Sequence, residues 1–143
     1  MDSEEIEGRA EKTLREADTY RVPIRVDKVA RSLNLTMEAV PLGDRISGLL
    51  VVEDDRGAIG YNSAHSRARQ RFTISHEIAH FLLHAKKGGK AELFIDSHVR
   101  FRPNESVSAS SERKEVEANQ LGAALLMPKG LVQDRLVNLR MLR

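Results

Sequence analysis

The sequence contains no cysteine and no tryptophan, and aromatic residues make up only 4% of its 143 residues. Without cysteine the chain can form neither a disulfide bond nor a thiolate metal site, which agrees with a cytoplasmic protein. With so few aromatic residues, the core must be mainly aliphatic. No apolar run approaches the roughly 20 residues of a membrane-spanning helix, so we expect no membrane partner. The acidic start, Asp2-Ser3-Glu4-Glu5, does not resemble a signal peptide.

The chain also lacks a strong excess of either charge, since its net charge is only +2. We therefore expect no direct binding to nucleic acid. A DNA-binding module built on the N-terminal helices is an alternative, but residues 27–33 offer only Lys28 and Arg31 as basic side chains. The length predicts a single domain, residues 1–143, with one core.

One pentapeptide, His76-Glu77-Ile78-Ala79-His80, indicates a specific chemistry. On a helix, residues four apart share a face, so the imidazoles of His76 and His80 can bind one metal ion. Glu77 can then reach a water on that metal as a general base, as in the H-E-x-x-H motif of zinc hydrolases. The alternative is two core histidines beside an incidental glutamate. Burying three such groups without an ion is costly, which favours the metal site.

The surroundings of the pentapeptide predict a buried helix over residues 65–84, a stretch without glycine or proline. Apolar side chains cover most of its circumference, which is typical of a helix in the centre of a domain. The two histidines and the glutamate lie on its single polar stripe. This stripe should therefore line an interior cleft.

A third protein ligand is needed, and the helix predicted over residues 111–127 contains two glutamates that compete for this role. Glu115 shares a face with Asn119 and Gly122, whereas Glu117 points roughly 200° away. The small Gly122 would let this helix approach the first one closely. Asn119 could hydrogen-bond a ligating histidine. We therefore predict that Glu115, rather than Glu117, completes the metal site.

The order of the predicted elements indicates an α+β fold, in which a small, mainly antiparallel sheet packs beside the two ligand-bearing helices. A hairpin turn is expected at residues 53–57, Asp27 should cap the second helix, and one short strand is conceivable at residues 93–95. The predicted segments are N-terminal helices within 3–33, a sheet within 35–62, the metal helix 65–84, a loop 85–110, the glutamate helix 111–127 and a C-terminal helix 129–140.

Several of these motifs together resemble the ImmA/IrrE family of metallo-endopeptidases. The resemblance includes Arg71–Ser75 just before the pentapeptide, Glu115–Asn119, and Leu125–Pro128, and it covers roughly residues 24–130. It implies a zincin-like domain that holds zinc through His76, His80 and Glu115, with Glu77 as the base. One departure is Leu121-Gly122, where family members often have Phe-Ala after a variable residue.

The resemblance also implies a function, because members of the family act inside bacterial cells on helix-turn-helix repressors. We therefore predict a zinc-dependent endopeptidase, also active with manganese, that cleaves or inactivates such a repressor in a prophage or mobile-element switch. The alternative is a non-catalytic repressor-binding partner or toxin–antitoxin component with a structural zinc. Glu77 argues against this alternative, because a structural site needs no general base.

Two further expectations concern the substrate. Tyr61, His84 and His98 are candidates for stabilising the oxyanion that forms during hydrolysis. An extended substrate is expected to add a strand at a sheet edge near residues 49–61, where main-chain hydrogen bonds would align the scissile bond.

Overall fold

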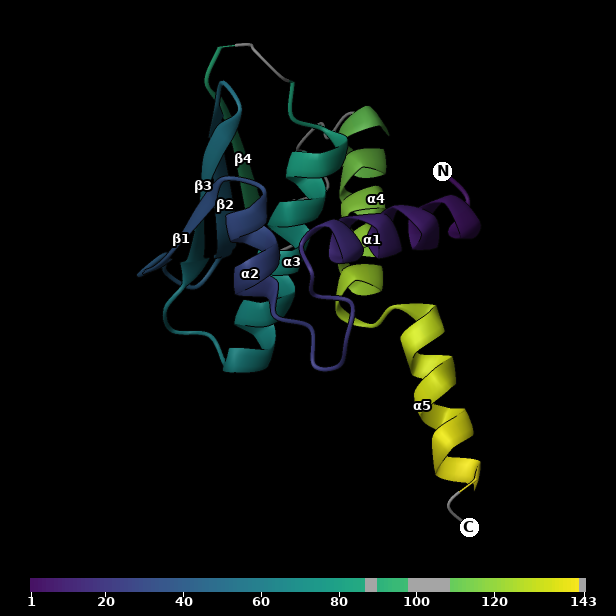
Figure 1. Cartoon of the computed structure of the whole chain (residues 1–143). Helices are drawn as coiled ribbons and strands as arrows, with labels where there is room; N and C mark the ends of the chain where they lie inside the picture. Colours follow the sequence, from purple (N-terminus) through teal and green to yellow (C-terminus); the bar gives the residue numbers. More distant parts are fainter. Residues whose placement is uncertain (87–89, 98–108, 142–143) are drawn as a thin grey trace.

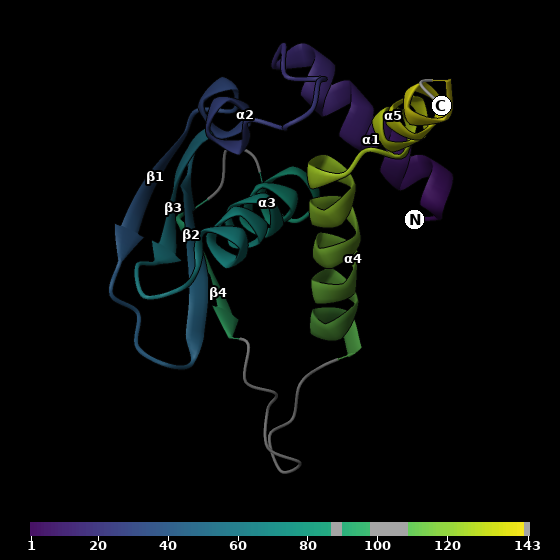
Figure 2. The same cartoon turned by 90° about the horizontal axis from the view of Figure 1, so that it is seen from below.

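The structure, a computed structural model, describes residues 1–86, 90–97 and 109–141, and it confirms the α+β fold. In Figures 1 and 2 the helix α3 lies between the sheet on one side and α4 on the other. In this part of the chain no helix is long and apolar enough to cross a membrane. The elements are α1 (Ser3–Glu16), α2 (Val26–Ser32), β1 (Leu35–Val40), β2 (Ile46–Glu53), β3 (Arg56–Asn62), α3 (Arg67–Leu83), β4 (Glu92–Ser97), α4 (Ala109–Leu126) and α5 (Lys129–Met141).

The sheet has the strand order β1-β3-β2-β4 and is mainly antiparallel, as predicted. β2 pairs antiparallel with both β3 and β4, and β1 pairs parallel with β3. The hairpin turn is tighter than expected, because Glu53 pairs with Arg56 across only two residues. Asp54, the first of these two, adopts the left-handed conformation that such a turn needs (φ 56°).

The expected loop over residues 85–110 is wrong for the segment that forms β4. This strand is longer than the short one suggested by the sequence, and it covers the side of β2 that the hairpin leaves free. Consequently both strands within residues 49–61 are interior, and the predicted substrate edge is not an edge. Residues 87–89 and 98–108 of the expected loop lie outside the described part of the chain.

The pentapeptide occupies the most buried part of the molecule, as its apolar neighbours predicted. Every residue from Thr73 to His80 in α3 is buried, and this stretch packs between the sheet and α4. The helix begins after Ser66, whose side chain accepts a hydrogen bond from the Arg69 amide. A serine in this position satisfies one of the free amides of the first turn.

The contact between α3 and α4 is unusually close at Gly122, which confirms the role expected for this glycine. The Ser75 hydroxyl donates a hydrogen bond to the Gly122 carbonyl at 2.7 Å. A Cβ atom at Gly122 would lie 3.2 Å from both the N and the Cα atom of His76. The two backbones can therefore approach only because residue 122 has no side chain.

The N-terminal helices lie on the outside of this core. α1 buries Ile6, Ala10 and Leu14, and it lies against α4. α2 follows from Val26, but Asp27 does not cap it as predicted, since the helix begins one residue before Asp27.

Asp27 instead forms ion pairs with the residue before α2 and with a residue in its last turn. Its carboxylate accepts hydrogen bonds from Arg25 at 2.9 Å and from Arg31 at 2.7 Å. The bond from Arg25 contributes most to lowering the pKa of Asp27, which falls to about 2.

Gly8 of α1 and Gly122 of α4 allow a matched test of the close helix contact. Gly8→Ala should raise the free energy of unfolding by about 0.5–1 kcal/mol, because alanine restricts the unfolded chain and the site on α1 has open space around it. Gly122→Ala should instead lower it, by about 1–3 kcal/mol, because the added methyl group overpacks the contact with His76. Urea denaturation of both variants measures this, and equal gains in stability would contradict the account.

Candidate metal centre

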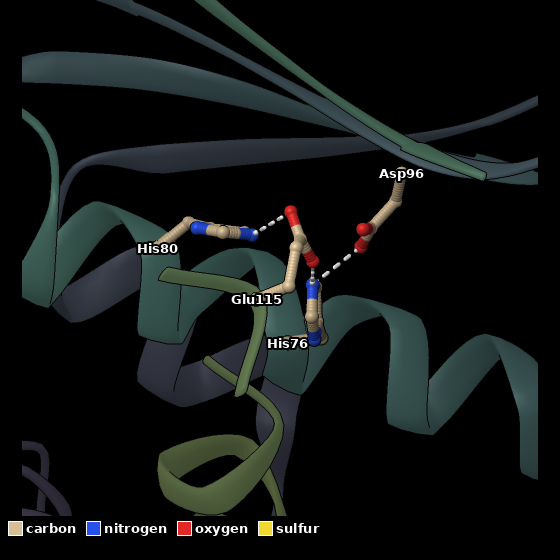
Figure 3. A group of neighbouring side chains, drawn as sticks. All are labelled: His76, His80, Asp96 and Glu115. Carbon is tan, nitrogen blue, oxygen red and sulfur yellow. Dashed lines mark hydrogen bonds and ion pairs between the residues drawn. The ribbon is translucent and has the colours of Figure 1, made fainter. Parts of the chain in front are cut away.

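Four side chains from three elements converge on one point beside α3 (Figure 3). His76 and His80 come from α3, Glu115 from α4 and Asp96 from β4. Each offers a nitrogen or oxygen atom, and these atoms all lie within 4.8 Å of one another. Such convergence of imidazole nitrogens and carboxylate oxygens can hold a divalent metal ion.

The three side chains expected from the sequence to bind metal are thus neighbours. Glu115 uses its two oxygens separately, one 3.1 Å from His76 Nε2 and the other 3.2 Å from His80 Nε2. The two imidazole rings lie edge to face, with their centroids 4.7 Å apart. Both Nε2 atoms therefore point toward the same place, and the role of the three residues as ligands is a prediction that this geometry supports.

Glu115 and Glu117 were expected to point to opposite sides of α4. This expectation is wrong, because both side chains contact α3. Glu117 is half-buried and lies 3.3 Å from His84 Nε2. The two glutamates flank the buried Ala118, about 60° away on one side and about 100° on the other, so their long side chains can both reach the neighbouring helix. The two glutamates differ in where they contact α3. Glu115 contacts His76 and His80, and Glu117 contacts His84.

Asp96 belongs to the cluster but was not identified from the sequence. Its Oδ2 atom lies 2.7 Å from His76 Nε2, closer than Glu115 does. Asp96 was missed because its segment was interpreted as a loop. The alternation of burial along β4 places Phe94 and Asp96 toward α3 and leaves Leu93 and Ile95 exposed. The run Leu93-Phe94-Ile95 was the available sequence signal for a strand, but it did not indicate that Asp96 faces inward, because the exposed positions of β4 are themselves apolar.

Glu77 is completely buried, and neither of its carboxylate oxygens has a hydrogen-bond partner among the described residues. Burial raises the pKa of Glu77 far above its usual value, and the negative charges of Asp96 and Glu115 raise it further. Gly48 of β2 lets the sheet approach α3 beside Glu77: a Cβ atom there would overlap the Thr73 methyl group, and it would lie in ordinary contact, 3.5 Å, with Glu77 Oε2. An unpartnered buried carboxylate of this kind needs a functional explanation.

A chain of polar contacts orients His80. Its Nδ1 atom lies 2.9 Å from Nδ1 of His84, and His84 in turn contacts Glu117. Phe94 stacks on the His80 ring with the centroids 5.3 Å apart. Contacts of this kind fix the orientation of a metal-ligating histidine. His84 therefore lies on the Nδ1 side of His80, away from the Nε2 atom that faces Glu115, so it is placed to orient His80 rather than to bind an oxyanion.

Three other residues singled out in the sequence are not part of the cluster. Tyr61 lines a cavity with Gln70 and Ile74, nearer the start of α3 than the motif histidines. Asn119, which was expected to hydrogen-bond a ligating histidine, is exposed, and the buried Nδ1 atom of His76 has no partner in the described part of the chain. His98 lies outside the described residues.

The cluster passes a simple test of fit for a metal ion. Two imidazoles and carboxylates suit zinc, and they also suit manganese. Burial lowers the pKa of His76, but the contacts with Asp96 and Glu115 outweigh this and raise it to about 9. Burial raises the pKa of Glu115, but the hydrogen bonds with His76 and His80 outweigh this and lower it. In the metal-free protein the proton of His76 therefore lies where a metal ion would bind.

Removing each glutamate of α4 should separate their roles. Glu115→Gln is expected to weaken zinc binding strongly, because a neutral amide replaces a carboxylate that faces both Nε2 atoms. Glu117→Gln should have a smaller effect, at most about 10–100-fold, because it reaches the cluster only through His84. Competition with a chromophoric chelator measures both affinities, and the reverse ranking would contradict the assignment of Glu115.

Zinc binding should also strengthen as the pH rises. The metal must displace the proton of His76, whose contribution to the stability of the metal-free fold is fully present below pH 6.5 and is lost as the pH rises through about 9. Apparent affinity should therefore increase by about tenfold per pH unit between these values, as for one displaced proton. The same titration with the chelator alone corrects for the chelator, and a flat profile would be inconsistent with a protonated His76.

Comparison with known proteins agrees with the geometry. A family model described as Peptidase_M78, the IrrE N-terminal-like domain, matches residues 30–140. A search among curated proteins finds no match. The matched region contains β1 to β4, both ligand-bearing helices and all four residues of the cluster. The chain therefore belongs to the ImmA/IrrE family, and this membership supports a metallopeptidase function.

Proposed function

We propose that this protein is a zinc-dependent endopeptidase that cleaves a helix-turn-helix repressor in the bacterial cytoplasm. The observation that carries the proposal is the buried Glu77, whose unpartnered carboxylate lies next to two histidines that converge on a shared point. A structural metal site has no use for such a group. Family membership supports the peptidase part of the proposal.

In this proposal His76, His80 and Glu115 hold the zinc ion. When bound, the ion supplies Lewis acidity, which lowers the pKa of water toward neutrality and polarises a peptide carbonyl. The HExxH helix and α4 are fixed against each other at Gly122, so the three side chains are held in place before the ion binds.

Glu77 acts as the proton carrier. It accepts a proton from the attacking water and returns it to the leaving amine when the peptide bond breaks. Burial makes this carboxyl group more basic than an exposed one, which favours holding the proton between the two steps. The nearby cation would oppose this shift and keep the group able to give the proton away.

The substrate is expected to lie along β4 rather than beside residues 49–61. In the described part of the chain β4 is an edge of the sheet, and its Asp96 side chain reaches the metal cluster. An extended peptide that pairs with this edge would pass the ligands with its backbone aligned. The register of β4 on β2 is regular from Glu92 to Asp96 and shifts only after Asp96.

The choice of a repressor as substrate rests on the resemblance to the ImmA/IrrE family, whose members act on such proteins. Binding of DNA by this chain itself has little support. One of the two basic side chains of α2, Arg31, is paired with Asp27, and the net charge is only +2.

The proposal is tested with the helix-turn-helix repressor encoded beside the gene, mixed with the zinc-loaded protein and analysed for fragments by mass spectrometry. The wild type should cleave the repressor at one exposed segment. Glu77→Gln should fold and retain zinc but lose cleavage by about 10²–10⁴-fold, because only the proton carrier is removed. Glu53→Gln, an exposed carboxylate at the end of β2, is the matched control and should cleave normally.

Two outcomes would contradict the proposal. A Glu77→Gln variant with the wild-type rate would mean that another group carries the proton. Stoichiometric binding of an intact repressor by the zinc-loaded wild type would instead favour a non-catalytic binding partner.

A further inference from the structure

The position of Asp96 is not explained by a site with three protein ligands. Its carboxylate makes the shortest contact in the cluster, 2.7 Å to His76 Nε2, although it comes from a third element, the edge strand β4. Asp96 is 16% exposed, so most of its charge is removed from water. Such burial is costly unless the carboxylate is paired with a cation.

The nitrogen atom that Asp96 contacts shows which role it can take. A carboxylate that only orients a ligating histidine binds the ring nitrogen that faces away from the metal. Asp96 lies instead at Nε2, the same atom that faces Glu115. The other nitrogen of the ring, Nδ1, is buried and has no partner in the described residues. Asp96 therefore lies on the metal side of His76.

The backbone of β4 holds Asp96 there. Phe94, two residues earlier on the same face of the strand, stacks on the ring of His80. β4 thus places one residue on each motif histidine, and the pairing of Gly48 with Asp96 fixes the strand at this level. Gly48 lets β2 approach α3 at this level, because a Cβ atom there would overlap the Thr73 methyl group.

We propose that Asp96 is a fourth protein ligand, which completes the coordination of the metal in the resting protein and is displaced when a substrate or inhibitor binds. This inference rests on the metal site of the proposed function and adds its regulation. Four protein ligands are typical of closed sites, whereas catalysis needs an open position. Because Asp96 lies on the edge strand where the substrate is expected, pairing of a substrate with β4 and release of the carboxylate would be coupled.

The test uses a small metal-binding ligand, acetohydroxamate, in place of the unidentified substrate. Wild type, Asp96→Asn and Asp96→Ala are compared in two measurements: zinc affinity by chelator competition, and acetohydroxamate affinity by visible absorption of the cobalt-loaded protein. Glu92→Gln is the matched control, because it removes a carboxylate from the same strand that, among the described residues, accepts a hydrogen bond from the Lys86 amide and does not belong to the metal cluster. Thermal melting by circular dichroism verifies the fold of each variant.

The two affinities should change in opposite directions. Loss of a ligand should weaken zinc binding by about tenfold or more, while acetohydroxamate should bind several-fold more tightly because it no longer competes with the carboxylate. Glu92→Gln should change neither affinity. A role in orientation alone, or simple damage to the site, would not tighten acetohydroxamate binding.

Unchanged affinities in both Asp96 variants, or a fall in both affinities, would overturn the inference. If the wild type binds zinc and cleaves its substrate in that case, the proposed peptidase stands without a fourth ligand. If the wild type binds no zinc at all, both the inference and the proposed function fail.

Discussion

The structure depends on the close contact between α3 and α4 at Gly122. This contact brings the backbone of α4 against His76, and the hydrogen bond from Ser75 to the Gly122 carbonyl fixes it. Glu115, two turns before Gly122 on the same face of α4, lies opposite the motif histidines, and Glu117 reaches α3 at His84. A side chain at position 122 would press against the backbone of His76, so the two helices would have to shift apart by a few tenths of an ångström.

Packing alone would not favour this arrangement, because it places an unusual number of ionisable groups in the core. Glu77 is fully buried without a hydrogen-bond partner, and Asp96 and Glu115 share the proton of His76. Groups of this kind oppose folding unless a cation compensates them. The same groups are what hydrolysis of a peptide needs, so the fold accepts a local cost where its chemistry takes place.

Structural features that depend on local spacing were predicted correctly from the sequence. Features that depend on contacts between distant segments were not. The HExxH helix, its burial, the close approach at Gly122 and the proximity of Glu115 all follow from helical periodicity. Asp96 could not be found in this way, because its position depends on the pairing of β4 with β2, 45 or so residues away. The substrate edge was misplaced for the same reason. The opposite-face argument for Glu117 failed because the long side chains of both glutamates reach α3 from either side of the small, buried Ala118.

The central claim is that His76, His80 and Glu115 hold a single catalytic metal. A crystal structure of protein grown with zinc, with data collected on both sides of the zinc absorption edge, tests it most directly. The account predicts one anomalous peak between α3 and α4, in contact with Nε2 of His76, with Nε2 of His80 and with the Glu115 carboxylate. A peak elsewhere, or no peak while the side chains keep their direct contacts with one another, would contradict it.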